Sequence, residues 1–421
     1  MRKYFLLFGF IMPLSLLAQW TTASGITRGR NDDVFFVNDS IGYVAGGVRN
    51  TISKTVDGGD SWTNIFTVGT YLRSINFLDA STGFCGSLDT AFYMTVDSGN
   101  TWVDISSNIS PVPKGICGLS SPNDSTIYGC GIYNEPAFIV KSTDRGTTWT
   151  YIDMSLYAKA LVEVHFISQD TGFVAGRANP FADGGVILYT TDGGISWTSV
   201  YKTMRNLDYV WKIQSPDGQN YFASVSSVPN SGNTTFLKST DSGLSWVQGI
   251  VDTAWYDIQM IGFIDSLKGW TGGANQLFET FDGGTSWNKT LATIPGGTYF
   301  NRFVKKNDSS AVISGLKIYK YDVNQITTGI IEPKREEDQI HALKVTPNPT
   351  SQLYFEVLIG NATHASIQLI DLQGSVLETF HHRKIAEGKH SFQSDKKYEA
   401  QVMFIIMRTN EGLYTEKVVF E

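Results

Sequence analysis

The stretch TVDGGDSW at residues 55–62 recurs five times, as TVDSGNTW at 95–102, STDRGTTW at 142–149, TTDGGISW at 190–197, STDSGLSW at 239–246 and TFDGGTSW at 280–287. Every copy has an Asp, a Gly two residues later and a Trp three residues after that Gly. The acidic positions are Asp57, Asp97, Asp144, Asp192, Asp241 and Asp282, and successive ones lie 40 to 49 residues apart. This period is typical of a four-stranded propeller blade rather than of a helical repeat.

The residue types of this motif suit a hairpin corner. We expect the Asp carboxylate to accept hydrogen bonds from backbone N–H groups two residues on, while the Gly takes a positive φ and the Trp buries its indole in the next strand. A calcium loop needs several oxygen ligands at alternating positions, and each copy has one dependable carboxylate. We therefore interpret the six Asp residues as structural and expect neither metal nor cofactor.

A second repeat precedes the first by about a dozen residues and occurs seven times. Its copies are IGYVAGG at 41, TGFCGS at 82, STIYGCG at 125, TGFVAG at 171, NYFASV at 220, KGWTGG at 268 and SAVISG at 310. Each is an aromatic or β-branched run that ends in small residues, as expected for a strand near a crowded axis. The sequence therefore predicts a seven-bladed β-propeller over residues 20–323, with about 43 residues per blade.

The seventh blade lacks a corner of its own, because LKIYKYDVNQ after residue 315 contains neither Gly nor Trp. The missing strand is expected at the other end of the chain. Trp20 lies 16 residues before Phe36, much as Trp62 lies 15 residues before Phe77. We predict that the N-terminal segment closes the last blade and so removes an open sheet edge.

The corners, with their Ser or Thr flanks, resemble the Asp box of sialidase-type and other bacterial propellers. Their alternation with GYVAGG-like segments is similar to the seven-bladed family of photosystem II assembly and stability factors. This resemblance covers residues 20–323 and implies the fold. It does not select one function, because such propellers include sialidases, xyloglucanases, ligand-binding receptors and assembly factors.

The first 19 residues have the pattern of a cleaved signal peptide, with Arg2 and Lys3, an apolar stretch to Leu17 and a small residue at Ala18. No later run is long and apolar enough for a transmembrane segment, so we expect none in the mature chain. The net charge of −7 and the pI near 5.4 argue against nucleic acid as a partner, since its binding relies on clustered Lys and Arg.

Residues 324–342 form a charged, Pro-bearing linker, and residues 343–421 contain short alternating strands separated by Gly, Asn and Asp turns. This pattern predicts a small immunoglobulin-like β-sandwich. PNPTS at 347, DLQG at 371 and the terminal YTEKVVFE resemble the sorting domain of the type IX secretion system, although AQVM at 400–403 replaces the Gly-x-Tyr strand start often found there. The resemblance implies the secretion machinery as a partner of residues 343–421. It also implies export across a Gram-negative envelope, to the medium or the cell surface.

Three cysteines, Cys85, Cys117 and Cys130, form no disulfide framework. Cys117 and Cys130 are expected on neighbouring strands of the third blade, and whether they form a bridge stays open at this point. No Cys–His pair has the spacing of a metal site or of a nucleophile and its base.

A ligand is expected on the propeller face opposite the Asp corners, where the longer second loops and the blade-to-blade segments lie. Aromatic and Arg side chains there suit a glycan, a peptide or a protein partner through stacking and bidentate hydrogen bonds. The candidate binding residues are Arg30, Tyr71, Arg73, Arg177, Tyr209, Trp211, Tyr256, Asp257, Tyr299 and Arg302.

Two functions remain open: a non-catalytic binding propeller, which we favour, and a secreted glycoside hydrolase. A hydrolase needs paired carboxylates or, in sialidases, a Tyr nucleophile, and the acids available to it would be Glu163, Asp183 and Asp257. Sialidases have six blades and a FRIP-like motif that this sequence lacks, and xyloglucanases of this blade type use two propellers. We therefore predict no catalytic residues.

Overall fold

A computed structural model of the chain describes residues 19–26, 28–132, 136–227, 232–290, 299–322, 341–345, 348–360, 362–371, 376–409 and 413–420. The predicted signal peptide up to residue 18 and most of the predicted linker at 324–342 lie outside these ranges. Two compact units are present: Trp20–Tyr321, and a smaller unit that holds the strands after residue 340. Among the described residues, no helix is long and apolar enough to cross a membrane.

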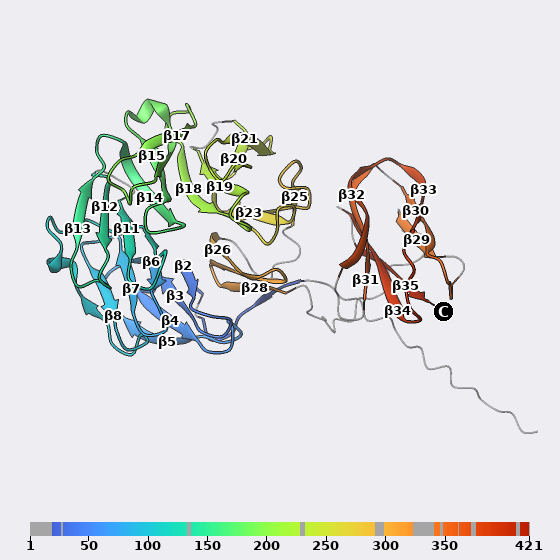
Figure 1. Cartoon of the computed structure of the whole chain (residues 1–421), viewed down its shortest axis with the longest axis horizontal. Coiled ribbons are helices and arrows are strands. Elements are labelled where there is room, and N and C mark those ends of the chain that lie inside the picture. Colours follow the sequence, from blue (N-terminus) through green and yellow to red (C-terminus); the bar gives the residue numbers. More distant parts are fainter. Residues whose placement is uncertain are drawn as a thin grey trace, which may run out of the picture. The chain divides into compact units, whose positions relative to one another are not determined.

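The larger unit is a ring of seven four-stranded sheets (Figure 1). The first six blades in chain order are β2–β5, β6–β9, β10–β13, β14–β17, β18–β21 and β22–β25, and the seventh combines β26–β28 with β1. The strands are β1 (Gln19–Thr22), β2 (Asn31–Phe36), β3 (Gly42–Gly46), β4 (Thr51–Thr55), β5 (Thr63–Thr67), β6 (Leu72–Phe77), β7 (Gly83–Ser87), β8 (Phe92–Thr95), β9 (Val103–Asp104), β10 (Gly118–Ser120), β11 (Ile127–Gly131), β12 (Phe138–Ser142), β13 (Thr150–Asp153), β14 (Ala158–Phe166), β15 (Gly172–Ala178), β16 (Gly185–Thr190), β17 (Thr198–Lys202), β18 (Tyr209–Gln214), β19 (Tyr221–Ser226), β20 (Thr234–Ser239), β21 (Val247–Asp252), β22 (Ile258–Phe263), β23 (Gly269–Gly273), β24 (Gln276–Thr280), β25 (Asn288–Lys289), β26 (Phe300–Asn307), β27 (Ser310–Gly315) and β28 (Ile318–Asp322).

The ring closes where β1 lies beside β28. Just beyond β1, the N–H of Ala23 donates to the carbonyl of Ile318 at 2.9 Å. Trp20 is buried, and its ring lies 5.2 Å from that of Trp270 and 5.3 Å from that of Tyr321. The N-terminal strand therefore covers the edge that blade seven would otherwise leave open.

Each Asp corner joins the third and fourth strands of a blade. In the first corner, Thr55 Oγ1 donates to Asp57 Oδ1 at 2.7 Å and the Ser61 N–H donates to the same oxygen at 3.0 Å. Trp62 Nε1 donates to the carbonyl of Gly59, a residue with a φ of 94°. In the other five corners, too, the backbone N–H four residues after the Asp donates to the Asp Oδ1. The acceptors are Asp97, Asp144, Asp192, Asp241 and Asp282. The amide bound is thus four residues after the Asp and not two as expected, because two positive-φ positions curl the loop back over the carboxylate.

The second repeat forms the second strand of each blade. In two copies the closing Gly is required by the close approach of the backbone that leads into the first strand. A Cβ at Gly273 would lie 2.0 Å from the carbonyl oxygen of Asp257, and one at Gly315 would lie 1.9 Å from that of Tyr299. Neighbouring blades are joined by stacked rings, such as Tyr128 of β11 on Phe166 of β14 with centroids 3.5 Å apart.

The smaller unit is a sandwich of two sheets. One has the order β29 (His341–Val345), β30 (Tyr354–Ile359), β33 (Gly388–Gln393), and the other has the order β32 (Val376–Ile385), β31 (Thr363–Ile370), β34 (Val402–Thr409), β35 (Leu413–Val419). Alternating residues of both sheets form one apolar core, which includes Phe355, Ile367 and Ile405. The predicted fold class, a propeller followed by a small β-sandwich, is confirmed.

Cys85, Cys117 and Cys130 are buried, and none of the three takes part in a disulfide. The bridge left open for Cys117 and Cys130 is therefore not formed here. Burial raises the pKa of Cys85 and of Cys130 well above the ordinary range of a thiol.

Candidate functional site

The channel at the centre of the ring is lined by the first strand of each blade. Six of these seven strands contain a β-bulge, at which one residue is inserted between two paired ones. The inserted residues are Asp32, Arg73, Trp211, Gln259, the pair Lys159 and Val162 in β14, and the pair Asn301 and Lys306 in β26. A bulge re-aims side chains and sends neighbouring residues toward the same side of a sheet. Polar groups that strict alternation would separate can therefore meet in the channel.

An upper layer of the channel is built around Asp32, which is fully buried. Its Oδ1 accepts hydrogen bonds from Arg30 Nε at 2.8 Å and from Arg73 Nη1. Arg30 Nη2 also donates to Gln259 Oε1 at 2.7 Å, which links blade one to blade six. Burial opposes the charge on Arg73, but the adjacent Asp32 carboxylate outweighs it and raises the pKa of Arg73.

From Arg73, further aromatic and cationic side chains extend across the centre of the propeller. The Arg73 guanidinium carbon lies 5.6 Å from the ring centroid of Trp211, which stacks on Tyr209 with centroids 5.2 Å apart. Arg177 covers the other side of this group, 4.5 Å from the Tyr209 ring and 4.8 Å from the Phe181 ring. We call Arg30, Arg73, Arg177, Tyr209, Trp211 and Phe181 the arginine–aromatic array.

Two donors of the array have no acceptor in the described part of the chain. Arg177 Nε and Trp211 Nε1 are both buried, and no described residue accepts a hydrogen bond from either atom. A buried donor left without an acceptor costs free energy, so such groups are expected to find a partner when a ligand is present.

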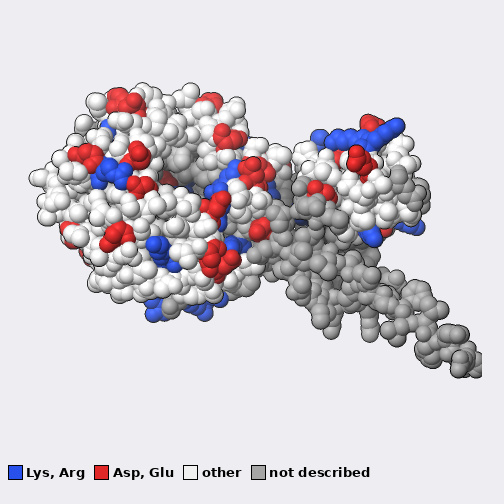
Figure 2. Space-filling model, turned by 60° about the horizontal axis from the view of Figure 1, so that its bottom comes forward, with Lys and Arg blue, Asp and Glu red and all other residues white. Residues whose placement is uncertain are grey.

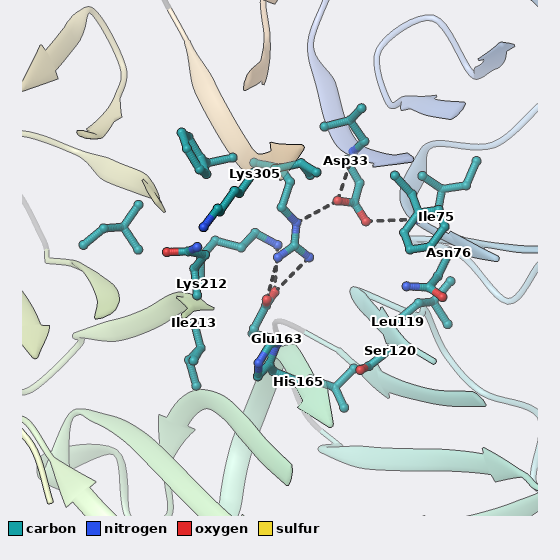
Figure 3. Close-up of a pocket in the computed structure, with 18 of the residues that line it drawn as sticks. Asp33, Ile75, Asn76, Leu119, Ser120, Glu163, His165, Lys212, Ile213 and Lys305 are labelled. Atoms are coloured by element: carbon teal, nitrogen blue, oxygen red, sulfur yellow. Dashed lines mark hydrogen bonds and ion pairs between the residues drawn. The ribbon is translucent and has the colours of Figure 1, made fainter. Parts of the chain in front are cut away.

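A second layer lies deeper in the channel and consists of Asp33, Glu163, Lys212 and Arg302, which we call the channel quartet. Arg302 Nε donates to Asp33 Oδ1 at 2.8 Å, and its Nη1 donates to Glu163 Oε1 at 2.6 Å. Lys212 Nζ donates to Glu163 Oε2 at 3.0 Å. Figure 3 shows Asp33, Glu163 and Lys212 converging from three different blades. Two carboxylates and two cations make the quartet neutral.

The members of the quartet shift one another's pKa values and so keep their charges when buried. Burial acts against the charge of Glu163, but Arg302 and Lys212 outweigh it and lower the pKa of this carboxyl. Burial likewise opposes the charge of Arg302, and Asp33 and Glu163 raise its pKa nonetheless. Burial and the repulsion of Arg302 lower the pKa of Lys212. Glu163 is therefore an ionised ion-pair partner rather than a proton donor.

Beside the quartet the channel holds a cavity of about 270 Å³, lined by polar side chains that include Asn76, Ser120, His165, Gln214 and Lys305. Figure 2 shows one face of the propeller hollowed at its centre, with basic and acidic groups near the hollow. Burial lowers the pKa of His165, which favours a neutral imidazole. Gln214 bonds both backbone groups of Phe263, so this part of the wall holds neighbouring blades together.

The structure brings five of the predicted site residues into the array: Arg30, Arg73, Arg177, Tyr209 and Trp211. Arg302 lies in the quartet, and Tyr71 packs with Asp32 against the small surface of Gly47. The other three belong to neither layer. Tyr256 accepts a hydrogen bond from Lys289, Asp257 accepts one from Ser226, and the side chain of Tyr299 is exposed.

Sequence reasoning missed Asp32, Asp33, Lys212 and Gln259 as members of these layers. Charged residues inside the otherwise apolar first strand of a blade, such as Asp32 and Asp33 in β2 and Lys212 in β18, would have been the available signal. Phe181 was also missed, since it lies in a loop. Among the described residues, no three His, Cys, Asp or Glu side chains gather as metal ligands would.

No protein-family model matches the chain, and no curated protein sequence matches it. Solved structures do. YCF48 bound to a D1 peptide is similar at 16% identity and a TM-score of 0.57, over 74% of this chain and 97% of that one. YCF48 from Cyanidioschyzon merolae is similar at 15% identity and a TM-score of 0.57, over 72% and 98% of the two chains.

PorZ, described as an essential bacterial surface component of the type-IX secretion system of Porphyromonas gingivalis, is similar at 11% identity and a TM-score of 0.53. That similarity covers 93% of this chain and 59% of PorZ. At such low identities the likeness concerns the fold alone. The chain therefore shares the β-propeller fold of YCF48 and PorZ.

Proposed function

We propose that this protein is a non-catalytic propeller that binds a peptide or a peptide-like segment of a protein partner through the arginine–aromatic array. The observation that carries the proposal is the array itself, which extends from Arg30 in blade one to Phe181 in blade four across the mouth of the channel. Guanidinium groups bind carboxylates and carbonyl oxygens through paired hydrogen bonds, and aromatic faces stack on planar groups.

The unpartnered donors indicate which chemistry the ligand brings. Arg177 Nε and Trp211 Nε1 need acceptor oxygens, which a peptide backbone and acidic side chains both supply. The cations of the array are only partly neutralised, because Asp32 is the one carboxylate that the described contacts place beside Arg30 and Arg73. An acidic segment therefore complements this face better than a basic one.

Apolar side chains around the array favour a protein segment over a small polar sugar. Leu156 is 85% exposed and Met204 is 69% exposed, while Phe181 and Leu207 are each 40% exposed. All four belong to blade-to-blade or second loops of blades three to five, on the face opposite the Asp corners. Exposed apolar groups gathered beside a polar centre are typical of protein interaction sites.

The surroundings of the three acids weigh against the hydrolase. Glu163 is held by Arg302 and Lys212, Asp183 pairs with Lys202 at 2.6 Å, and Asp257 accepts a hydrogen bond from Ser226 at 2.8 Å. A glycosidase acid needs a raised pKa, and that of Glu163 is lowered. The similarity of fold to YCF48 bound to a D1 peptide adds support for a peptide ligand.

We further propose that the chain is exported to the cell surface or the medium by the type IX secretion system. Residues 1–19 would direct it across the inner membrane, and residues 343–421 would serve as the sorting domain. The surface role stated for PorZ, which has a similar fold, is compatible with this route.

The test is a peptide array probed with the full-length mature protein. We expect preference for acidic peptides over neutral and basic ones. Replacing Arg177 with Gln should weaken binding roughly tenfold, the effect of one lost charge-assisted hydrogen bond. Arg145→Gln is the matched control, because this Arg lies at an Asp corner on the opposite face and pairs with Asp79. Equal loss in both variants, or release of reducing sugar from polysaccharides, would contradict the proposal.

A further inference from the structure

The cavity beside the channel quartet is separate from the arginine–aromatic array. No residue of the array lines it, and its walls come from the first strands of all seven blades. In β18, for example, Gln214 of the lining follows Trp211 of the array. Because the third strand of a blade runs parallel to the first and ends at an Asp corner, the cavity lies on the corner side of the quartet.

The corner end of the cavity is accessible from solvent. His165, Gln214 and Lys305 lie near the ends of their strands and are only half-buried. Asn76 and Ser120 of the same wall are each 8% exposed. The volume of about 270 Å³ lies near the lower end of the range for ligand pockets, which begins at about 300 Å³. A small molecule fits this space, whereas a folded segment of a partner does not.

The polar groups that remain available in the cavity are mainly donors. Lys212 Nζ carries three hydrogens, and Glu163 Oε2 is its one acceptor among the described residues. Asn76 Oδ1 accepts a hydrogen bond from Ser121, but no described residue accepts one from the Asn76 amide nitrogen. Both side chains are almost fully buried, so these hydrogens need acceptors inside the cavity.

The acceptors of the wall are already occupied. Both oxygens of Glu163 accept hydrogen bonds from the quartet cations, and Asp33 accepts from Arg302 and from two backbone N–H groups. The Gln214 amide bonds to the backbone of blade six through both of its polar atoms. A neutral His165 adds one donor and one acceptor. The ligand must therefore bring oxygen acceptors.

The charged side chains of the lining sum to +1. The quartet is neutral, and Lys305 adds one cation. Lys305 pairs with Asp308 at 2.7 Å, but the Asp308 side chain is 94% exposed and solvent screens its charge. Within the quartet, burial and then the repulsion of Arg302 lower the pKa of Lys212. An anion beside these cations would offset that repulsion.

The cavity also offers apolar contacts. Among the described lining residues, Phe35 and Val304 are the apolar ones that keep some exposure. Chloride or phosphate would make no use of them, whereas a carbon skeleton packs against them. In Figure 3, Lys212 and Lys305 lie on one side of the cavity and Asn76 lies on the other. A ligand that spans the cavity therefore needs oxygen atoms at both ends.

We propose that this cavity binds a small hydroxy acid with a single carboxylate. The carboxylate lies at Lys212 and Lys305, a hydroxyl oxygen accepts a hydrogen bond from Asn76, and the carbon skeleton packs against Phe35 and Val304. Charge-assisted hydrogen bonds from two lysines select the anion over its neutral counterpart. The site is a second one, on the other side of the quartet from the array, and does not depend on the peptide-binding proposal.

The experiment is calorimetric titration of the full-length mature protein with D-gluconate and L-lactate. D-glucitol and lactamide are the neutral references, and inorganic phosphate is the reference anion. We expect both hydroxy acids to bind, and all three reference compounds to bind at least roughly tenfold more weakly. No binding of either hydroxy acid, or tighter binding of phosphate or of the neutral compounds, would overturn the proposal.

Two variants locate the site. Lys305→Gln removes the extra charge of the lining and should weaken binding of the hydroxy acids roughly tenfold. Lys306→Gln is the matched control, because this neighbouring lysine does not line the cavity and donates to the carbonyls of Asp39 and Gly58. Equal losses in the two variants would mean that the site lies elsewhere.

Asn76→Ala tests the opposite wall and should also weaken binding. The fold tolerates this change, because Ser121 keeps the Phe77 carbonyl as an acceptor. Undiminished binding in both Asn76→Ala and Lys305→Gln would contradict the proposal. Peptide binding by the array should be unchanged in these variants, so failure of one proposal leaves the other standing.

Discussion

At the scale of single residues, the channel quartet shows how a buried charge is tolerated. Glu163 is 1% exposed, and its two oxygens are shared between Arg302 and Lys212. Burying an isolated carboxylate would be far too costly, so each charge depends on the others. The quartet also ties blade seven to blades one and four, because Arg302 binds both Asp33 and Glu163, and it adds blade five through the bond from Lys212 to Glu163.

Replacing Glu163 with Gln should therefore destabilise the fold strongly. The change leaves Arg302 and Lys212 with two positive charges and only Asp33 to balance them. We expect a loss of about 3–5 kcal/mol in the free energy of unfolding, the usual cost of removing one partner of a buried pair. Urea unfolding followed by Trp fluorescence measures it.

Glu279→Gln is the control for that experiment. Glu279 lies 3.6 Å from Lys268 in a pair that is more exposed than the quartet, and such pairs contribute about 1 kcal/mol or less. Equal effects of the two substitutions would mean that the quartet is not a coupled unit.

At the scale of elements, the stability of the Asp corner depends on pH. Hydrogen bonds from the Thr148 hydroxyl and amide, and from Ser142, hold the pKa of Asp144 at about 2, below its ordinary 3.8. A carboxyl whose pKa is lowered by folding stabilises the fold above its unfolded pKa and loses that contribution as the pH falls through the folded value. The stabilisation by Asp144 is thus complete above about pH 4 and is lost toward pH 2.

Asp144→Asn should consequently lower the urea midpoint at pH 7 and have a much smaller effect at pH 2, where the wild-type carboxyl is about half protonated and most of its charge-dependent stabilisation is lost. Asp124→Asn, at an exposed loop position of the same blade, is the matched control and should leave the midpoint unchanged at both pH values. A midpoint difference of the same size at pH 2 and pH 7 would rule out the carboxylate charge as the cause.

The elements were largely predictable, whereas the site was only partly so. The corner can be predicted from Asp57 and Trp62, because the residues that form hydrogen bonds within it lie within eight positions of one another in the sequence. The channel joins residues as distant as Arg30 and Gln259, and its geometry depends on bulges that strand alternation does not reveal. Arg73 was predicted as a site residue from its place in the chain, while its carboxylate partner Asp32 was not.

At the scale of the whole molecule, the short strand β1 closes the seven blades into a ring. β1 supplies the outer strand of blade seven, so the first and last strands of the propeller lie in one sheet. Trp20 anchors this strand against Trp270 and Tyr321, which come from blades six and seven. In blade seven, Trp20 from the start of the propeller thus takes the position that a corner Trp has in the other blades.

Trp20→Ala should open this closure without disturbing the other blades. Removing a buried Trp costs about 3–5 kcal/mol, and here the loss also weakens the pairing of β1 with β28. Hydrogen exchange should accelerate in residues 318–322, and light scattering should rise with protein concentration because a free strand edge invites association. Trp149→Ala, at the corner of blade three, removes an equal side chain that packs on Phe84 and Phe92. If that control exposes residues 318–322 to exchange as much as Trp20→Ala does, the closing strand has no special role and the ring is held by blade stacking alone.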